Sequence, residues 1–503
     1  MSLRTEHAAV NEPADPLPGP LPWQWLIGIT ALAALLRAIA LNSDLWVDEV
    51  FSLLASIRRP IIDSFVSFTG DTQHPLYMPL AQLSVAIFGE SPASIRLPAM
   101  LFGVASVPML YRLGTAVTTR REAAIAASLL ALSYHHIWFS QSARGYTMLA
   151  FWLLLSTWLL LRLVRRPTVL LLLAFAASSA CGVFTHATMV FAILGQALVL
   201  GVYLLAVAAD RRAINWPWTI AAFALAGAFT LLLYAPMLDQ VISFFLHRRS
   251  PLVGVSTPHW ALGEAYRVLQ AGLGALGPAA GPAVLMALLV LMTGFISFVR
   301  RNALATALFT VPVLVTFAGA LLARGTMYPR FFFFLAGFFV LLLVRGTLVI
   351  AMAVAAWLKW RWLRPSLAAY LAAGLMLAVS AASLVPLYRY PKQDFSGAMQ
   401  FVDSVSRDQD RVVAVGTAAR VYREYFGRNW PAAASDAELQ GLRASGQRVW
   451  VVYTLAMYIA AEDPQLMRVL NEDCRQRQRF RGTLGGGDLY VCVLEPRNPA
   501  SEG

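Results

Sequence analysis

Charged residues are scarce in this chain of 503 residues: they make up 13% of it, while 58% is hydrophobic. Soluble globular proteins carry about 25% charged residues. The shortage excludes a soluble enzyme, a disordered chain and a fibrous protein, and it indicates a protein that crosses a membrane several times. Nearly all of the net charge of +13 arises before Leu387, where the chain has 25 basic and 13 acidic residues. Basic loops on the inner side of a membrane explain such an excess, so we expect no nucleic-acid partner.

Cysteine is equally scarce, because only Cys181, Cys474 and Cys492 occur, and this excludes a disulfide-rich scaffold. The sequence also lacks a nucleotide-binding loop, a GxSxG elbow and an HExxH motif. It therefore offers nothing for an ATP-driven pump of the P-loop kind. No tight spacing of metal ligands appears, so no metal site or other cofactor is predicted, although a divalent cation stays an open alternative.

Long apolar runs are what the chain has instead. Runs of spanning length lie at 23–41, 96–117, 122–140, 146–164, 168–184, 187–208, 216–236, 281–299, 303–322, 331–355 and 366–388. The run 76–88 is too short to cross easily. When the N-terminus is placed inside, the basic clusters at Arg120, Arg165, Arg211, Arg300 and Arg364 all fall on the inner side. We expect an all-α polytopic membrane protein with about eleven crossings.

The composition divides the chain into three parts. These are a cytoplasmic tail (1–22), a transmembrane core (23–388) with an outer loop at 42–75, and an outer domain (389–503). The tail has no basic n-region and no cleavage site, so a signal peptide is not expected.

The outer domain has the composition of a soluble protein. Short apolar runs at 411–416, 448–453 and 489–494 predict buried strands, and 394–406 predicts a helix. A small α/β domain follows from this alternation. It contains Cys474 and Cys492 on the oxidising side, where a disulfide and two free thiols are equally open alternatives.

Acidic residues are nearly absent from the predicted spans. Between Ala123 and Leu387 there are three, whereas the outer loop 42–75 alone has five. We therefore expect any carboxylate base in this loop, and Asp48 and Glu49 are the best candidates. They lie at the mouth of the first span, where apolar cover can raise a pKa into a useful range. The alternative is an interfacial amphipathic helix with its charges in water.

Arginines on the outer side form a second candidate cluster. Arg144 lies at the outer end of one predicted span, and Arg324 and Arg330 flank the outer segment 325–329 between two spans. The positive-inside rule does not explain them, whereas a planar guanidinium suits a phosphate; contact with lipid headgroups is the alternative. Two arginines lie within spans: we expect Arg37 to snorkel to the surface, and Arg345 has no evident acidic partner.

Four motifs in order resemble those of glycosyltransferase family 39. They are Leu45–Glu49 (LWVDE), His74–Tyr77 (HPLY), a stretch from Phe88 to Gly103 (FGE, IRLP and FG) and Ser140–Tyr146 (SQSARGY). This family of C-type membrane glycosyltransferases includes protein O-mannosyltransferases and the transferase that puts aminoarabinose on lipid A. Two departures stand out: Ser142 replaces the family's glutamate, and His74 replaces a proline.

The resemblance implies a C-type fold and an inverting transfer of a hexose or pentose from a polyprenyl phosphate. The acceptor would be a lipid, glycan or protein of the envelope, at the outer face of a bacterial cytoplasmic membrane. Asp48 is the implied base, with Glu49 supporting it. The implied substrate and carrier-phosphate residues are His74, Tyr77, Arg96, Arg144, Tyr146, Arg324, Tyr328 and Arg330. A flippase for a lipid-linked glycan and a non-catalytic membrane partner remain the competing interpretations.

Overall fold

The computed structural model describes most of the chain. The described residues are 23–496 without 69, 71–72, 207–214, 248–258, 261, 264–265, 268–269, 271–273, 323–328, 360–363, 445 and 484–485. The expected tail 1–22, Arg211, Arg324 and Tyr328 therefore lie outside the described residues.

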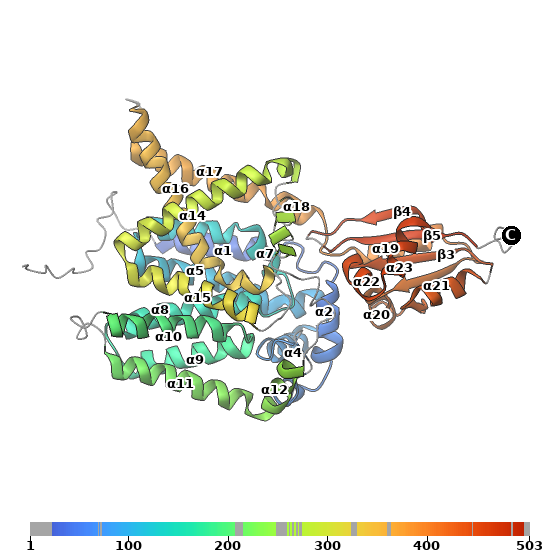
Figure 1. The fold of residues 1–503 in the computed structure, drawn as a ribbon, viewed down its shortest axis with the longest axis horizontal. Helices are drawn as coiled ribbons and strands as arrows, with labels where there is room; N and C mark the ends of the chain where they lie inside the picture. The colour runs from blue at the N-terminus through green and yellow to red at the C-terminus, as the bar shows by residue number, and fades with distance from the viewer. Residues whose placement is uncertain are drawn as a thin grey trace, which may run out of the picture.

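A body of apolar helices makes up the larger part of the molecule (Figure 1). Its helices are α1 (Trp23–Ala38), α4 (Tyr77–Phe88), α5 (Pro92–Val117), α6 (Arg120–Ala131), α7 (Tyr134–Ser140), α8 (Tyr146–Leu163), α9 (Val169–Thr185), α10 (Met189–Ala206), α11 (Trp216–Tyr234), α12 (Leu238–His247), α14 (Ala280–Arg301), α15 (Ala303–Leu322), α16 (Ala336–Leu358), α17 (Pro365–Ala382) and α18 (Leu384–Arg389). Seven helical stretches of the described chain are long and apolar enough to cross a membrane, and four more apolar helices are shorter. The mostly helical fold is thus confirmed.

The expected single run 122–140 is wrong, because it forms two helices. Helix α6 ends at Ala131 and α7 begins at Tyr134. Between them, the Ser133 hydroxyl caps α7 by accepting a hydrogen bond from His136 N at 3.3 Å. The predicted run 366–388 is confirmed as one stretch of spanning length, Pro365–Arg389, in which Ser383 keeps a helical conformation between α17 and α18.

Arg37 does not snorkel, and that expectation is wrong. Its side chain is fully buried. Its guanidinium donates to the carbonyls of Leu130 and Ala131, both at 3.2 Å, at the C-terminal end of α6. It also donates to Ser140 Oγ at 3.0 Å. A helix ends with unsatisfied carbonyls and a partial negative charge, so Arg37 serves as a buried cap where α6 breaks off.

Arg345 has an acidic partner after all. Its Nη1 contacts Glu122 Oε1, in the first turn of α6, and its Nε donates to Ser297 Oγ of α14 at 2.9 Å. Glu122 lies one residue before the segment in which acidic residues become rare, and 223 positions separate it from Arg345, so no sequence pattern pairs the two. The ion pair joins α6, α14 and α16 within the helical body.

The C-terminal part is a five-stranded mixed sheet with helices. The strands are β1 (Arg411–Val415), β2 (Ala432–Ala433), β3 (Val449–Thr454), β4 (Arg475–Phe480) and β5 (Leu489–Leu494). Their order is β2-β1-β3-β5-β4; β1 runs parallel to β2 and β3, while β5 is antiparallel to β3 and β4. The helices are α19 (Phe395–Val405), α20 (Thr417–Arg420), α21 (Asp436–Arg443), α22 (Ala456–Glu462) and α23 (Pro464–Glu472). The predicted α/β fold is confirmed, and Cys474 and Cys492 form a disulfide.

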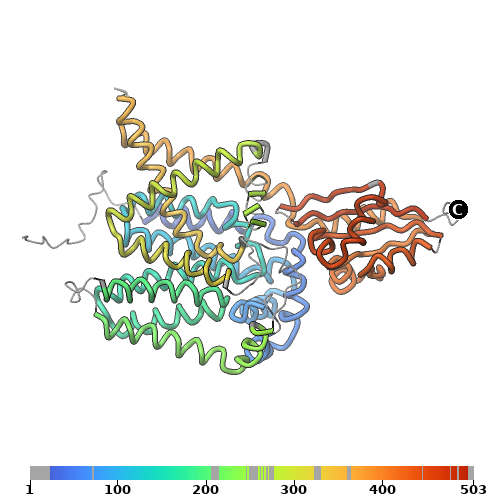
Figure 2. The backbone as a smooth tube through the Cα atoms, viewed as in Figure 1, coloured from blue at the N-terminus to red at the C-terminus, as the bar shows by residue number. Residues whose placement is uncertain are grey.

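The sheet shares an apolar core with the helical body. Phe395 of α19, Trp450 of β3 and Val491 of β5 belong to the same buried cluster as Val47 and Val50, in the short outer helix α2 (Val47–Ser52). The tube in Figure 2 shows the chain passing from the helical body into the sheet beside this region. Because side chains of both parts are buried together, the sheet is held in a fixed position next to α2.

Helices α14 and α16 touch through their backbones. A Cβ added to Gly346 would lie 1.9 Å from Val290 O, and one added to Gly294 would lie 2.0 Å from Leu342 O. Small residues allow such close packing between apolar helices, where lipid provides no hydrophobic drive for association.

We therefore expect Gly346→Ala to lower the free energy of unfolding by about 1–3 kcal/mol, the usual cost of overpacking. Gly374→Ala in α17 is the matched control, because a Cβ there meets nothing within 4 Å. Thermal unfolding of the purified protein in detergent, followed by tryptophan fluorescence, measures both. Equal melting temperatures for the two variants would contradict the close α14–α16 contact.

Candidate active site

Asp48 and Glu49 lie in the first turn of α2, a helix that begins after extended Trp46. The Trp46 N–H donates to Glu49 Oε2 at 2.8 Å and so caps the helix. Neighbouring residues of an α-helix point roughly 100° apart around its axis. The two carboxylates therefore face different surroundings, although they are adjacent in sequence.

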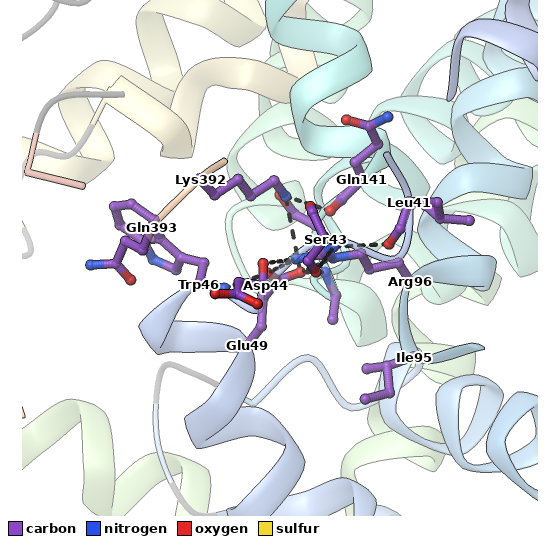
Figure 3. A network of polar contacts seen from close by, with 12 residues as sticks. Leu41, Ser43, Asp44, Trp46, Glu49, Ile95, Arg96, Gln141, Lys392 and Gln393 are labelled. Atoms are coloured by element: carbon purple, nitrogen blue, oxygen red, sulfur yellow. Dashed lines mark hydrogen bonds and ion pairs between the residues drawn. The ribbon is translucent and has the colours of Figure 1, made fainter. Parts of the chain in front are cut away.

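Glu49 forms a buried ion pair with Arg96 of α5 (Figure 3). Arg96 Nε lies 2.9 Å from Glu49 Oε1, Arg96 Nη2 lies 2.7 Å from Oε2, and both side chains are at most 1% exposed. The Ala143 N–H also donates to Glu49 Oε1, at 2.5 Å. The other N–H groups of Arg96 donate to the carbonyls of Leu41, Ser43 and Asp44 at 2.8–2.9 Å.

These contacts keep Glu49 ionised. Burial acts to raise its pKa, but the positive charges of Arg96 and Lys392 outweigh burial and lower it to about 2. A carboxylate so firmly deprotonated is a poor proton acceptor. The geometry therefore favours a structural role for Glu49 and for Arg96. Tyr77 is likewise buried, its hydroxyl donating to Ile95 O at 2.7 Å, and neither Tyr77 nor Arg96 lines the cavity described below.

Lys392 completes this network, and the sequence analysis missed it. Its Nζ donates to Gln141 O and, at 2.6 Å, to Ser142 Oγ; it lies 4.0 Å from Glu49 Oε1 and 4.4 Å from the centre of the Trp138 ring. The ammonium thus occupies the place beside Ser142, where the family motif has a glutamate. One feature of the sequence points to this residue: Lys392 is one of only two lysines in the chain.

Asp48 faces a cavity of about 1010 Å³ between the helical body and the sheet. The cavity is also lined by Arg144, Tyr146 and Arg330, which sequence reasoning selected from separate stretches of the chain. Arg330 Nη1 forms an ion pair with Asp48 Oδ2 at 2.9 Å. Glu49 also contributes to the lining, so the structure brings together both predicted carboxylates and two of the predicted arginines.

Several polar atoms next to the cavity are buried without a hydrogen-bond partner among the described residues. They include Nε and Nη1 of Arg144, the Tyr146 hydroxyl and Nε2 of His74. The ring centres of His74 and Tyr146 are 5.2 Å apart, and the Arg144 guanidinium lies 5.9 Å from the Tyr146 ring. Burial, followed by the charge of Arg144, lowers the pKa of His74, so His74 is neutral at physiological pH. Unpaired buried donors are costly, which favours an anionic ligand here.

The cavity walls differ in character. Phe332, Phe333, Phe339, Val340 and Leu343, from the segment 329–335 and from α16, make one wall apolar. A polar part of the lining comes from β5 and from the connection between β4 and β5, and includes Arg481, Thr483, Asp488 and Tyr490.

Two hydrogen bonds fix the polar wall to α7. The Tyr134 hydroxyl donates to Thr483 O at 2.7 Å, and Trp138 Nε1 donates to Thr483 Oγ1 at 2.8 Å. The cavity thus joins an apolar surface to a polar one, with Asp48 and the arginines between them. The described residues contain no group of three or more His, Cys, Asp or Glu side chains suited to a metal ion.

Comparisons with known proteins show what the chain is similar to. Residues 73–237 match the family model of dolichyl-phosphate-mannose-protein mannosyltransferases. The chain is also 29% identical, over 160 residues, to a putative mannosyltransferase, YkcB, of Bacillus subtilis (strain 168). Both of these similarities are to mannosyltransferases. The YkcB match covers 29% of this chain and 22% of that protein's length, and the family match begins after Asp48.

One solved structure shares the fold of this chain. The archaeal oligosaccharyltransferase AglB from Archaeoglobus fulgidus, in complex with an inhibitory peptide and a dolichol-phosphate, aligns with a TM-score of 0.50 at 14% identity, over 93% of this chain and 74% of that chain. ArnT from Cupriavidus metallidurans in the apo state aligns with a TM-score of 0.47 at 14% identity, over 94% of this chain and 98% of that chain.

The buried ion pair makes a clear prediction for Glu49→Gln. The variant leaves Arg96 charged and incompletely paired, so we expect a loss of about 3–5 kcal/mol in unfolding free energy. The pKa of Glu49 is lowered from 4.5 to about 2. The ionised Glu49 carboxylate therefore stabilises the folded protein fully at pH values above 4.5, and this stabilisation is lost as the pH falls from 4.5 toward 2. Thermal unfolding at a series of pH values measures both effects.

Glu90→Gln is the matched control. Glu90 pairs with Arg58 at 2.7 Å, but the two side chains are 39% and 40% exposed. Exposed ion pairs contribute about 1 kcal/mol or less. A loss in Glu49→Gln no greater than that in Glu90→Gln would contradict the structural role of the buried pair.

Proposed function

We propose that this chain transfers a sugar from a polyprenyl-phosphate carrier to an acceptor of the cell envelope, with inversion at the anomeric carbon. The observation that carries the proposal is the buried guanidinium of Arg144, with two unpaired nitrogens, in the cavity that also holds the Asp48–Arg330 ion pair. Phosphate oxygens are suitable acceptors for such nitrogens. The relation to dolichyl-phosphate-dependent transferases and the dolichol-phosphate in AglB support the same ligand.

The two walls of the cavity suit the two parts of the donor. The isoprenoid tail lies along the apolar wall of Phe332, Phe339 and Leu343, and the phosphate lies at Arg144 and Arg330. His74 and Tyr146 offer further hydrogen bonds to the phosphate or to the sugar.

In the proposed reaction, an acceptor hydroxyl oxygen attacks the anomeric carbon from the face opposite the phosphate. The new oxygen–carbon bond forms as the bond between that carbon and the phosphate oxygen breaks. Asp48 takes the hydroxyl proton as general base. Arg144 and Arg330 compensate the charge that develops on the departing polyprenyl phosphate.

The orientation of the chain in the membrane and its number of crossings are part of the proposal. We place the cavity, the outer loop 42–75 and the domain 389–503 outside a bacterial cytoplasmic membrane, with the tail 1–22 inside and about eleven crossings in the core 23–388. In Figure 1 the end of α16 and the start of α17 project away from the sheet, and Lys359 and Arg364 adjoin these two helix ends in the sequence. Basic residues at the end remote from the sheet agree with the positive-inside rule.

Asp48→Asn tests the base. Asn keeps the shape and removes the proton acceptor, so we expect turnover to fall by about 10²–10⁴-fold while carrier binding persists. Purified protein in nanodiscs is incubated with a panel of polyprenyl-phosphate sugars and a membrane extract as the acceptor source, and released polyprenyl phosphate is measured by mass spectrometry. Asp63→Asn, on the same outer loop and outside the cavity, is the control.

Unchanged release of polyprenyl phosphate in Asp48→Asn would show that Asp48 is not the base. No release from any donor by the wild-type protein, with bound lipid still present, would favour a flippase.

Arg144→Gln tests the phosphate site. Loss of charge-assisted hydrogen bonds should weaken the binding of polyprenyl phosphate by about tenfold to a hundredfold. Tryptophan fluorescence titration in nanodiscs measures the affinity. Arg59→Gln is the control, because Arg59 is exposed on the outer loop. Similar affinities in the two variants would show that Arg144 does not hold the phosphate.

A further inference from the structure

Edge strand β4 carries arginines that the proposed reaction does not use. Its sequence is Arg-Gln-Arg-Gln-Arg-Phe, and Arg481 follows it. β4 ends the strand order of the described sheet (Figure 1), and Arg479 pairs in register with Tyr490 of β5. Alternate residues of a strand lie on the same face. Arg477 and Arg479 therefore share the face of β4 on which Tyr490 lies.

Aromatic rings hold these arginines in place. The guanidinium of Arg477 lies 4.3 Å from the ring centre of Tyr490 and 5.5 Å from that of Tyr453. The rings of Tyr453 and Tyr490 are themselves stacked, with centres 5.2 Å apart. Arg481 lies 4.9 Å from the ring centre of Tyr390. Such cation–π contacts orient a guanidinium over a ring face. Arg477 Nη1 donates to Asn471 Oδ1 at 3.2 Å, and a guanidinium has five N–H groups, so others remain for a ligand.

The arginine row leads into the cavity that contains Asp48. Arg479, Arg481, Tyr390 and Tyr490 all line this cavity. The acidic residue next to the row is Asp488, which pairs with Arg479 at 2.6 Å. Three arginines against this one carboxylate leave the rim of the cavity positively charged.

Protection of the sheet edge is the simplest alternative explanation, because charged residues on an edge strand discourage pairing with other chains. That function requires only that the charges be exposed. It accounts neither for the tyrosines that hold Arg477 and Arg481 nor for the position of Arg479 and Arg481 on the cavity wall.

We propose that Arg477, Arg479 and Arg481, with Tyr390 and Tyr490, form the docking site of the acceptor, and that the acceptor is an anionic glycan. Guanidinium groups bind carboxylates and phosphates through paired hydrogen bonds. Tyrosine rings add flat apolar faces and polar tips, which suit the two sides of a sugar ring. The site rests on the proposed transfer reaction, because a glycan held on this row presents its hydroxyls toward Asp48.

Binding of a defined polyanionic glycan tests the site. The probe is hexagalacturonate, and the neutral hexasaccharide maltohexaose is the comparison ligand. Calorimetric titration uses the full chain in phosphatidylcholine nanodiscs at low and high salt. We expect the wild-type protein to bind hexagalacturonate in preference to maltohexaose, and to lose affinity at high salt through screening.

The double variant Arg477→Gln/Arg481→Gln should bind hexagalacturonate about tenfold or more weakly, the loss expected for charge-assisted hydrogen bonds. Arg475→Gln is the matched control, because Arg475 is exposed on the same strand and does not line the cavity. It should stay within about twofold of the wild-type affinity, a change worth under 0.5 kcal/mol.

Two results would overturn the docking site. The first is a wild-type protein that does not prefer hexagalacturonate or a double variant that binds it as tightly as the wild-type protein does. The second is that, in nanodiscs containing phosphatidylglycerol, the wild-type protein and the double variant bind hexagalacturonate with equal affinity. That result would show that lipid headgroups occupy the row. Polyprenyl-phosphate binding, measured in parallel, should be unchanged in the double variant. A failure of the docking site is thereby distinguishable from a failure of the proposed reaction.

Discussion

The rest of the site depends on the buried ion pair between Glu49 and Arg96. Removing two charges from water is costly, and such a pair persists only when its remaining hydrogen-bonding groups are satisfied. Here the carbonyls of the segment 41–44 and the Ala143 N–H provide those contacts. One carboxylate therefore fixes α2 against α5 and against the turn between α7 and α8. Because Glu49 is held by Arg96 and Ala143, the adjacent Asp48 is directed toward the cavity and Arg330.

The same network extends into the sheet. The Val47 N–H donates to Gln393 Oε1 at 2.7 Å, Gln393 Nε2 donates to Thr454 Oγ1 at 2.9 Å, and Lys392 reaches the turn at Ser142. The segment 392–393 thus connects the helix of Asp48 to β3. Contacts of the segment 392–393 and the hydrogen bonds of Tyr134 and Trp138 to Thr483 together join the helical body to the sheet, so the two parts of the chain build one site.

The sequence supported good predictions where neighbouring residues share a pattern. Apolar runs predicted most helices, short β-branched runs predicted β1, β3 and β5, and ordered motifs selected Asp48 and Arg144. It could not predict β4, which is polar because it lies at an edge. The sequence also did not predict the partners of Arg37 and Lys392. Arg37 contacts Ser140, about 100 positions away, and Lys392 contacts Ser142, 250 positions away. The role of Glu49 depends on the direction of its side chain, which an Asp-Glu dipeptide does not reveal.

Charge balance explains why one carboxylate and two arginines suffice for the proposed chemistry. A polyprenyl-phosphate sugar is a phosphodiester with one negative charge, and Asp48 brings a second to Arg144 and Arg330. After transfer, Asp48 is protonated and neutral, and the released phosphate carries up to two charges. The sum stays near zero while one negative charge moves from the carboxylate to the phosphate. Arg330 pairs with Asp48 at 2.9 Å and lines the same cavity as Arg144, so it can pair with the phosphate once Asp48 is protonated. The proposed reaction therefore leaves no uncompensated charge in a partly apolar cavity.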